Sequence, residues 1–229
     1  MTWSFIHENL RTLILLGIWA YLLGSLPFAI WWGKLFHGVD VRQHGSGNAG
    51  ATNVFRTLGN KPGTAVLLLD VAKGYVAAAS ARLLFAKFGP ENPEYVSSAW
   101  IHLTLIMGAM AMLGHLFPLF ARFKGGKGVA TLFGLLIALD LTVAASALGI
   151  FVIAALIWRY VSLGSMLAAM SLPVWFRLYL DYDFGVLDAF AWGIAAVVVF
   201  MHRKNIERLR AGTESKMKFL PRHRSESAS

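Results

Sequence analysis

The sequence predicts an all-α, polytopic membrane protein with seven transmembrane helices, its N-terminus outside and its C-terminus in the cytoplasm. The first observation is composition: 57% of the 229 residues are hydrophobic and only 14% are charged, with a mean hydropathy of +0.58. A soluble core of this size cannot bury so many apolar side chains. The second is that apolar runs of bilayer length alternate with polar connectors. The third is that Lys and Arg gather in every second connector.

Charge and cysteine content exclude several classes of protein. The chain has no cysteine, which excludes disulfides, thiolate metal sites and a cysteine nucleophile. Its net charge of +9 would indicate nucleic acid in a soluble protein, but in a membrane protein it fits basic inner connectors beside anionic lipid. No RNA-binding motif accompanies that charge, so we expect no nucleic-acid partner.

The first three predicted spans cover residues 12–32, 63–85 and 100–116. Each is long enough to cross a hydrocarbon core of about 30 Å. Asp70 and Lys73 interrupt the second span one helical turn apart, where an unpaired charge is costly. They either neutralise each other, or Lys73 reaches a phosphate.

The apolar run 129–158 predicts two helices rather than one. A single helix of that length would extend about 45 Å and overshoot the bilayer core, so we place a break at 140–142. Spans at 163–180 and 185–201 follow. The connectors 34–62, 116–128 and 159–164 and the tail from His202 then share one face, which collects nearly all of the basic loop residues. We expect residues 1–218 to form one transmembrane domain and residues 219–229 a polar, disordered tail.

The first inner connector contains small and hydrogen-bonding residues suited to a phosphate. Its glycines spell G-x-G-x-x-G, but a bilayer-length helix precedes them, which excludes a dinucleotide-binding fold. Hydroxyl and amide groups are available, and Arg56 offers a two-pronged guanidinium. The alternative is a re-entrant turn with an ordinary flanking arginine. The candidate residues are Ser46, Gly47, Asn48, Thr52, Asn53 and Arg56.

The second inner connector is rich in glycine and lysine. Gly125, Gly126 and Gly128 can adopt positive φ, so we expect their N–H groups to converge on an anion. Lys124 and Lys127 bracket them, and the helix that follows adds its N-terminal dipole. The alternative is a flexible turn whose lysines face water.

The third segment begins where the last span ends. His202 and Asn205 would lie on one face of a continuing helix, both directed into a site. Glu214 follows a predicted helix terminus, where it can brace an arginine. The alternative is that the basic residues anchor to anionic lipid and that His202 is structural.

Together these segments resemble the bacterial acyl-phosphate-dependent glycerol-3-phosphate acyltransferase family (PlsY type). Residues 46–56, 115–131 and 205–216 match its three motifs, and shorter matches at 24–28, 70–74 and 160–164 extend the resemblance over about residues 20–218. The resemblance implies seven helices in the bacterial inner membrane and a site that faces the cytoplasm. It implies transfer of a fatty acyl group from acyl phosphate to the sn-1 hydroxyl of glycerol 3-phosphate. The products are lysophosphatidic acid and inorganic phosphate, in the first step of phospholipid synthesis.

Carried over by position, the resemblance assigns catalytic roles to Ser46, Arg56, Lys127, His202 and Asn205. Which of Lys124 and Lys127 makes the closer phosphate contact stays open, as does the choice between Ser162 and Ser165. Either His202 or the donor phosphate takes the hydroxyl proton. Glu214 is expected to be mainly architectural. The substrate-binding candidates are Gly47, Asn48, Thr52, Asn53, Lys124, Gly125, Gly126, Gly128, Ser162 and Glu214.

The expected partners are glycerol 3-phosphate, a fatty acyl phosphate and membrane lipids. An acyl phosphate is already activated, so no cofactor or metal is expected. The rival function is transport of a phosphorylated metabolite, which predicts an inverted repeat that the sequence does not contain. A CDP-alcohol phosphotransferase would need an Asp-rich metal motif, which is also absent.

Overall fold

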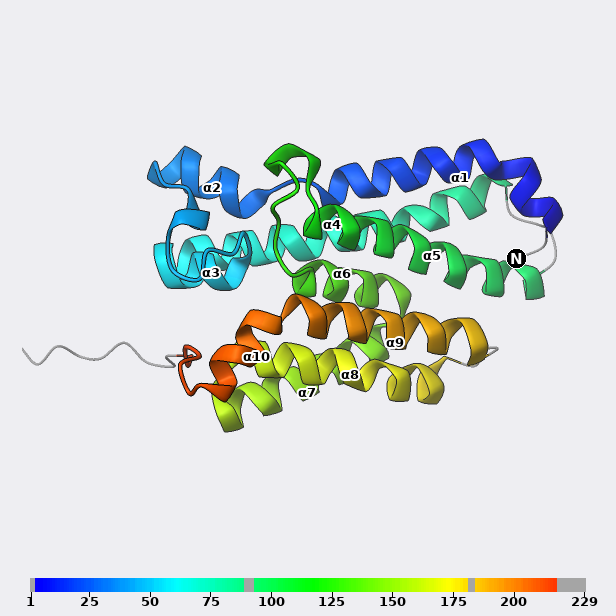
Figure 1. Cartoon of the computed structure of the whole chain (residues 1–229). Coiled ribbons are helices and arrows are strands. Elements are labelled where there is room, and N and C mark those ends of the chain that lie inside the picture. Colours follow the sequence, from blue (N-terminus) through cyan, green and yellow to red (C-terminus); the bar gives the residue numbers. More distant parts are fainter. Residues whose placement is uncertain (1–2, 89–92, 181–183, 218–229) are drawn as a thin grey trace, which may run out of the picture.

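The computed structural model describes residues 3–88, 93–180 and 184–217. Within these ranges every regular element is helical (Figure 1), which confirms the predicted all-α class. The predicted tail, 219–229, lies outside the described residues. The first half of the chain contains α1 Trp3–Gly24, α2 Phe28–His37, the 3₁₀ turn η1 Val41–Gln43, α3 Ala51–Leu58, α4 Asn60–Phe88 and α5 Pro93–Leu116. The second half contains η2 Leu119–Ala121, α6 Val129–Leu139, α7 Leu141–Trp158, α8 Val161–Tyr179, α9 Phe184–Met201 and α10 Arg203–Arg210.

The first predicted span is two helices rather than one, with a break between Gly24 and Phe28. Pro27 has no backbone N–H and disfavours helical geometry in the residue before it, so α1 ends there. The break also places polar groups inside the bundle. The Ser25 hydroxyl donates to the carbonyl of Tyr21 at 2.8 Å.

The predicted break in the long apolar run is confirmed at Asp140. This residue has an extended backbone between α6 and α7, and its side chain accepts a hydrogen bond from the Val143 N–H at 2.9 Å. An Asp that caps the first turn of a helix typically stabilises it by about 1 kcal/mol. The cap therefore fixes where α7 starts.

Five segments of the described chain are long and apolar enough to cross a bilayer, and the bent pair α9–α10 makes a sixth. The two helices of that pair meet at an angle of 59°. The remaining predicted span, the first part of the run 129–158, corresponds to α6, whose 11 residues extend about 16 Å, roughly half of a hydrocarbon core. The five segments are Leu10–His37, Asn60–Arg82, Trp100–Ala121, Leu141–Trp158 and Val161–Tyr179.

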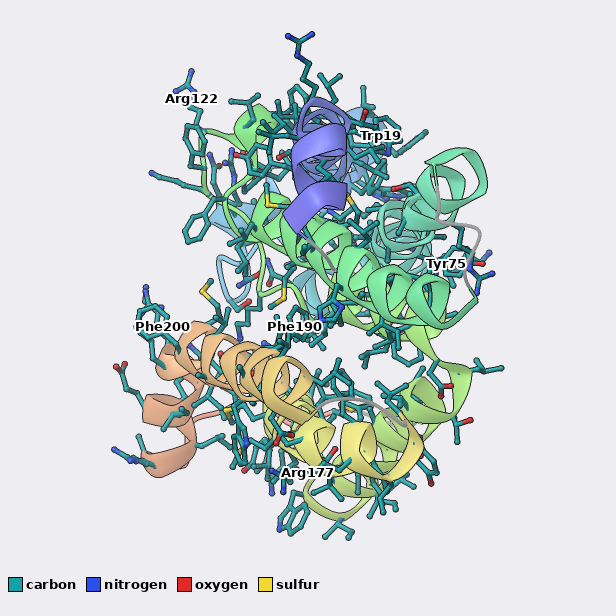
Figure 2. The ribbon with its side chains drawn as sticks, turned by 90° about the vertical axis from the view of Figure 1, so that its right-hand side faces the viewer. Trp19, Tyr75, Arg122, Arg177, Phe190 and Phe200 are labelled. Carbon is teal, nitrogen blue, oxygen red and sulfur yellow. The ribbon has the colours of Figure 1, made fainter. Side chains whose placement is uncertain are left out.

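The outer surface of the bundle is apolar, as expected for a protein surrounded by lipid. Leu15 and Phe200 expose 66% and 63% of their surface, values that a soluble protein of this size would rarely tolerate in such numbers. Figure 2 shows Trp19, Tyr75 and Phe200 on the outside of the helices. These faces therefore have the composition of a surface that contacts lipid chains.

The main apolar core draws on helices from both halves of the chain, including the fully buried Leu135 and Val198. Helices α4 and α6 cross at two glycines. A Cβ atom on Gly74 would lie 2.1 Å from the Thr131 carbonyl oxygen, and one on Gly134 would lie 2.1 Å from the Val71 carbonyl oxygen. Only glycine allows this backbone approach. The crossing fixes the start of α6 against α4, directly after the glycine-lysine connector.

Candidate active site

Four polar connectors meet at one end of the bundle, the end that carries α3 and α10 in Figure 1, away from the N-terminus. The Arg42 guanidinium donates to the Ala121 carbonyl at 3.4 Å and joins the first connector to the second. Lys127 in the second connector hydrogen-bonds to Asn205 in the C-terminal segment that follows α9. The Met217 N–H of that segment donates at 2.7 Å to the carbonyl of Arg159, which lies in the connector between α7 and α8. The predicted grouping of basic connectors is thus confirmed as a spatial arrangement.

The centre of this end is a hydrogen-bonded chain that begins at Lys127. Its ammonium donates to the Asn205 side-chain oxygen, and the Asn205 amide donates to Glu214 Oε1 at 2.6 Å. The Ser162 hydroxyl donates to the same Oε1 at 2.8 Å, and Arg208 Nε donates to Oε2 at 2.7 Å. Both oxygens of Glu214 thus accept hydrogen bonds from protein donors, three in all, and the architectural role expected for it stays a prediction.

Ser165, the alternative to Ser162, lies outside this chain. Its hydroxyl donates to the Val161 carbonyl within its own helix at 2.8 Å. Arg208 belongs to the cluster but is not among the sequence-derived candidates. Helix α10 ends at Arg210 and a turn follows it, as predicted, with Gly212 at a φ of 68° in the left-handed region. The turn brings Glu214 back to Arg208 rather than to Arg210, a choice that the order of residues alone does not reveal.

The charges of the cluster act on one another. Burial, the largest effect, lowers the pKa of Lys127 to about 8, with a further lowering from the cations Arg208 and Arg56 and a partial compensation from Glu214. Burial alone would raise the pKa of Glu214, but the hydrogen bonds from Arg208, Asn205 and Ser162 outweigh it and hold that pKa below its usual range. The Lys127 ammonium is therefore charged at neutral pH, but it loses its proton at a lower pH than an exposed lysine does.

His202 lies at the bend between α9 and α10 and is buried. Its Nδ1 is 2.8 Å from the Val198 carbonyl oxygen, which can only accept, so Nδ1 carries a proton. In the neutral ring Nε2 then has a free lone pair, and it makes no hydrogen bond to the described residues. His202 can accept a proton through Nε2. Asn205, three residues on, is also buried.

Asn53 organises the first connector. Its side-chain oxygen accepts from the backbone N–H of Ser46 at 2.8 Å and from the Ser46 hydroxyl at 3.1 Å. Its amide donates to the carbonyls of Val41 and His44 at 2.7 and 3.1 Å. Both ends of the Asn53 amide are thus used inside the protein. The side chain holds the loop in shape, and Ser46 stands at the exposed tip that results.

Arg56 sits in the last turn of α3 with an exposed side chain that makes no hydrogen bond or ion pair with the described residues. Its positive charge nevertheless contributes to the lowered pKa of Lys127. Gly47 and Lys124 are also exposed, and Lys124 is less enclosed than Lys127. Asn48 and Thr52 are half-buried with no side-chain hydrogen bond to the described residues.

The glycines of the second connector do not form the expected three-residue anion nest. Gly128 alone of the three has positive φ, at 79°. The N–H of Gly126 donates to the His115 carbonyl at 3.1 Å. A Cβ atom on Gly126 would lie 2.1 Å from His115 Nε2, and one on Gly125 would lie 2.0 Å from the His115 carbonyl oxygen. Gly125 and Gly126 are therefore required for close packing on His115 rather than for a left-handed backbone.

Asp70 and Lys73 pair with each other inside the bundle, which confirms the first of the two sequence alternatives. The Lys73 ammonium is 2.9 Å from Asp70 Oδ1. The same carboxylate oxygen is 3.5 Å from His115 Nδ1. The described residues contain no group of His, Asp and Glu arranged to hold a metal ion. The chemistry that the site offers is cationic anion binding beside one available imidazole nitrogen.

The chain is similar in sequence to glycerol-3-phosphate acyltransferases. Residues 14–212 match the family described as Glycerol-3-phosphate acyltransferase. The chain is 46% identical over 205 residues to the glycerol-3-phosphate acyltransferase of Geotalea daltonii, covering 90% of this chain and 97% of that protein. It is 42% identical over 221 residues to the one of Chlorobaculum parvum, covering 87% and 94%.

Solved structures of an integral membrane glycerol 3-phosphate acyltransferase, PlsY, share the fold. The glycerol 3-phosphate form matches with a TM-score of 0.77 and 37% identity, over 90% of this chain and 96% of that one. The lysophosphatidic acid form matches with a TM-score of 0.75 and 38% identity over the same shares. At this identity and coverage the likeness extends through the whole bundle.

Proposed function

The chain belongs to the glycerol-3-phosphate acyltransferase family, and from this premise we propose that it transfers a fatty acyl group from acyl phosphate to the sn-1 hydroxyl of glycerol 3-phosphate. The products are lysophosphatidic acid and inorganic phosphate. The similar PlsY structures in glycerol 3-phosphate and lysophosphatidic acid forms support these as substrate and product. Acyl phosphate as the donor is supported by the cationic groups Arg56 and Lys127, which suit phosphate oxygens.

One observation carries the proposal: four connectors meet at one end of the bundle, where the Lys127 ammonium hydrogen-bonds to Asn205 of the segment that also carries His202. Arg56, in the first of these connectors, adds a second cation close enough to lower the pKa of Lys127. Two phosphate groups repel each other strongly, and a protein that brings them together must supply compensating positive charge. Arg56 has all five of its N–H donors available, and the Lys127 ammonium uses one on Asn205. Removal of one such donor from a transition state costs about 2–4 kcal/mol.

In the reaction the C1 hydroxyl oxygen of glycerol 3-phosphate attacks the carbonyl carbon of the acyl phosphate. A new ester C–O bond forms, and the bond between the carbonyl carbon and the phosphate oxygen breaks. Inorganic phosphate leaves with the bonding electron pair. The hydroxyl proton passes to a phosphate oxygen directly or through Nε2 of His202. We assign phosphate contacts to Ser46, Arg56 and Lys127.

Other candidates act one step away from the substrates. We propose that Asn205 orients Lys127, and that Glu214, Ser162 and Asn53 hold the connectors in place, since their hydrogen bonds are satisfied by protein. The exposed or half-buried groups that remain would contact the glycerol phosphate or the donor. These residues are Gly47, Asn48, Thr52 and Lys124, whereas Gly128 is buried and would support the turn before α6.

The site faces the cytoplasm of the bacterial inner membrane in this proposal. We propose seven transmembrane segments, with α6 as a short one, the N-terminus outside and the C-terminus inside. The clustering of the basic connectors at one end supports this orientation, because basic loops favour the cytoplasmic side. Residues 1–218 would then act as a single catalytic domain.

The discriminating experiment supplies purified protein with palmitoyl phosphate and radiolabelled glycerol 3-phosphate, in the presence of a chelator and without nucleotide. We expect equimolar lysophosphatidic acid and inorganic phosphate, with the acyl chain at sn-1. Acyl transfer from acyl-CoA but not from palmitoyl phosphate would contradict the proposed donor. Uptake of glycerol 3-phosphate into sealed vesicles without acyl transfer would instead support a transporter.

A matched pair of variants ties the activity to the site. Lys127→Ala should abolish most of the turnover. Arg177→Met with Asp188→Asn removes an ion pair between α8 and α9, at side chains outside the connector cluster, and should leave turnover unchanged. Equal losses in both would trace the effect to folding rather than to the site.

A further inference from the structure

Three titratable side chains lie buried in the apolar part of the bundle, where the proposed reaction does not use them. Asp70, Lys73 and His115 expose 2%, 3% and 6% of their surface. They form one cluster, because Asp70 Oδ1 approaches both the Lys73 ammonium at 2.9 Å and His115 Nδ1 at 3.5 Å. Charges inside a membrane span cost several kcal/mol, and apolar residues of similar volume often replace a buried ion pair without loss of stability. Packing alone therefore does not account for the cluster.

The cluster connects to the break between α1 and α2. The Lys73 ammonium donates to the Leu26 carbonyl at 2.9 Å, across 47 residues of sequence. The same ammonium lies 5.5 Å from the centre of the Phe28 ring. The break interrupts the helical hydrogen-bond pattern, so a carbonyl there needs a donor from elsewhere. Lys73 supplies it and fixes the direction in which α2 leaves.

The cluster also connects to the glycine-lysine connector through His115. The ring of His115 faces Asp70, while its backbone carbonyl accepts from the Gly126 N–H at 3.1 Å. The Gly126 backbone lies so close to the ring that a Cβ atom would come within 2.1 Å of Nε2. Rotation or displacement of the His115 ring would therefore move Gly126. The next residue in the chain is Lys127.

A small cavity shows how these parts meet. It is lined by Asp70, Lys73 and His115 together with Gly125 and Gly126, and by Ala49 of the first connector. The cluster thus lies directly beneath two of the connectors that would hold substrate. The close crossing of α4 and α6 at Gly74, one residue after Lys73, keeps the other end of the glycine-lysine connector on the same support.

We propose that Asp70 is a positioning residue of the acyltransferase: held in place by Lys73, it orients His115, which seats Gly125–Gly126 and thereby places Lys127 at the substrate phosphate. This inference rests on the proposed function for its catalytic consequence, but not for its structural one. Its rival is that Asp70 and Lys73 only neutralise each other. The two explanations predict different values of kcat/KM when both charges are removed together.

The first test is the charge-balanced double variant Asp70→Asn with Lys73→Met. If the pair only neutralised itself, kcat/KM for glycerol 3-phosphate would stay at the wild-type value. Positioning predicts a fall of about 10- to 100-fold, because displacement of a catalytic group by 1 Å costs on that order. The control is Arg177→Met with Asp188→Asn, which also removes one ion pair and should change neither kcat nor KM.

The second test measures the connector directly and does not depend on any assumed reaction. The chain has no cysteine, so spin labels can be placed on cysteines introduced at the exposed positions Lys124 and Thr213. We expect the distance distribution between the labels to be narrow in the otherwise unchanged protein and broader in the Asp70→Asn, Lys73→Met background. The Arg177→Met, Asp188→Asn background should leave it unchanged. An unchanged distribution in the first background would overturn the proposal, even if activity fell.

The third test decides the matter if the double variant does not fold. In His115→Asn the side-chain amide can still donate to Asp70, whereas in His115→Leu it cannot. We expect His115→Asn to keep at least about tenfold more kcat/KM than His115→Leu. Equal activity of the two variants would overturn the role of the Asp70–His115 contact. A wild-type protein without acyl transfer would refute the proposed function, and the spin-label result would still stand or fall by itself.

Discussion

At the residue scale, the site separates groups that still have hydrogen-bonding capacity from groups that have none left. Arg56 and Nε2 of His202 make no hydrogen bond to the described residues, and Lys127 uses one donor on Asn205. Glu214, in contrast, accepts three hydrogen bonds from protein donors. Anionic ligands bind where donors are free. The free donors of Arg56 and Lys127 therefore mark the surface that meets substrate, and Glu214 marks its support.

The pKa of Lys127 leads to a prediction about pH. Burial lowers this pKa to about 8, so the ammonium is charged below that pH and becomes neutral above it. Since the charged form holds the phosphate, kcat/KM should fall tenfold per pH unit at pH values well above 8. Initial rates between pH 6 and 10, corrected for spontaneous hydrolysis of the donor, would show this limb. In Lys127→Arg the limb should vanish, because a guanidinium does not lose its proton in this range.

Arg56 tests the importance of geometry relative to charge. Its guanidinium can bind two phosphate oxygens at once, whereas a lysine ammonium is a point charge. We expect Arg56→Lys to lower kcat/KM by about 10- to 100-fold and Arg56→Ala by more. Because the side chain is exposed, both variants should keep the thermal stability of the wild type in detergent. Wild-type activity in Arg56→Lys would remove Arg56 from the site.

The sequence predicts which residue types reach this end of the molecule, but not which partner each one takes. Asn53 was expected to bind substrate, yet its amide bonds the backbone of residues 9 and 12 positions upstream. Gly126 was expected to offer its N–H to an anion, yet that N–H bonds to the carbonyl of His115. Backbone groups occur at every residue, so a pattern of side chains does not reveal which of them will compete with a ligand.

At the element scale, length and charge predict some helix boundaries and miss others. The break at Asp140 follows from bilayer thickness, because a single helix there would be too long. The break at Pro27 does not, because the apolar run continues through it and proline is tolerated in membrane helices. What distinguishes Pro27 is Lys73, which satisfies the Leu26 carbonyl from another helix. Such tertiary support is outside the reach of local sequence.

The packing of the glycine-lysine connector on the end of α5 yields a prediction about glycine. A methyl group at Gly126 would collide with the His115 ring, so Gly126→Ala should displace the connector and lower kcat/KM by about tenfold or more. Gly149→Ala is the matched control, since a Cβ atom there meets nothing within 4 Å. It should leave activity unchanged and raise helix stability slightly. Comparable losses in both variants would contradict a specific role for Gly126.

At the scale of the whole molecule, the fold collects connectors that are far apart in sequence. Hydrogen bonds join Arg42 to Ala121, Lys127 to Asn205, and Arg159 to Met217. The gathering of Lys and Arg in every second connector predicts this grouping, because basic connectors should share one side of the membrane. It does not anticipate that α6 spans about half a bilayer, because hydropathy does not separate a short buried helix from a full crossing.

The last prediction concerns the side of the membrane on which each connector lies. It can be tested with single cysteines, because the chain has none of its own. Single cysteines at Lys124, Thr213 and Gly185, all exposed, are to be treated with a membrane-impermeant maleimide on intact and permeabilised cells. Gly185→Cys should react from outside, whereas Lys124→Cys and Thr213→Cys should react only after permeabilisation. The unsubstituted chain provides the blank. Reaction of Lys124→Cys and Thr213→Cys from opposite sides would mean that the four helices α6 to α9 do not return the chain to the same face. Lys127 and Asn205 could then not share a site, and the acyltransferase mechanism proposed for it would fail.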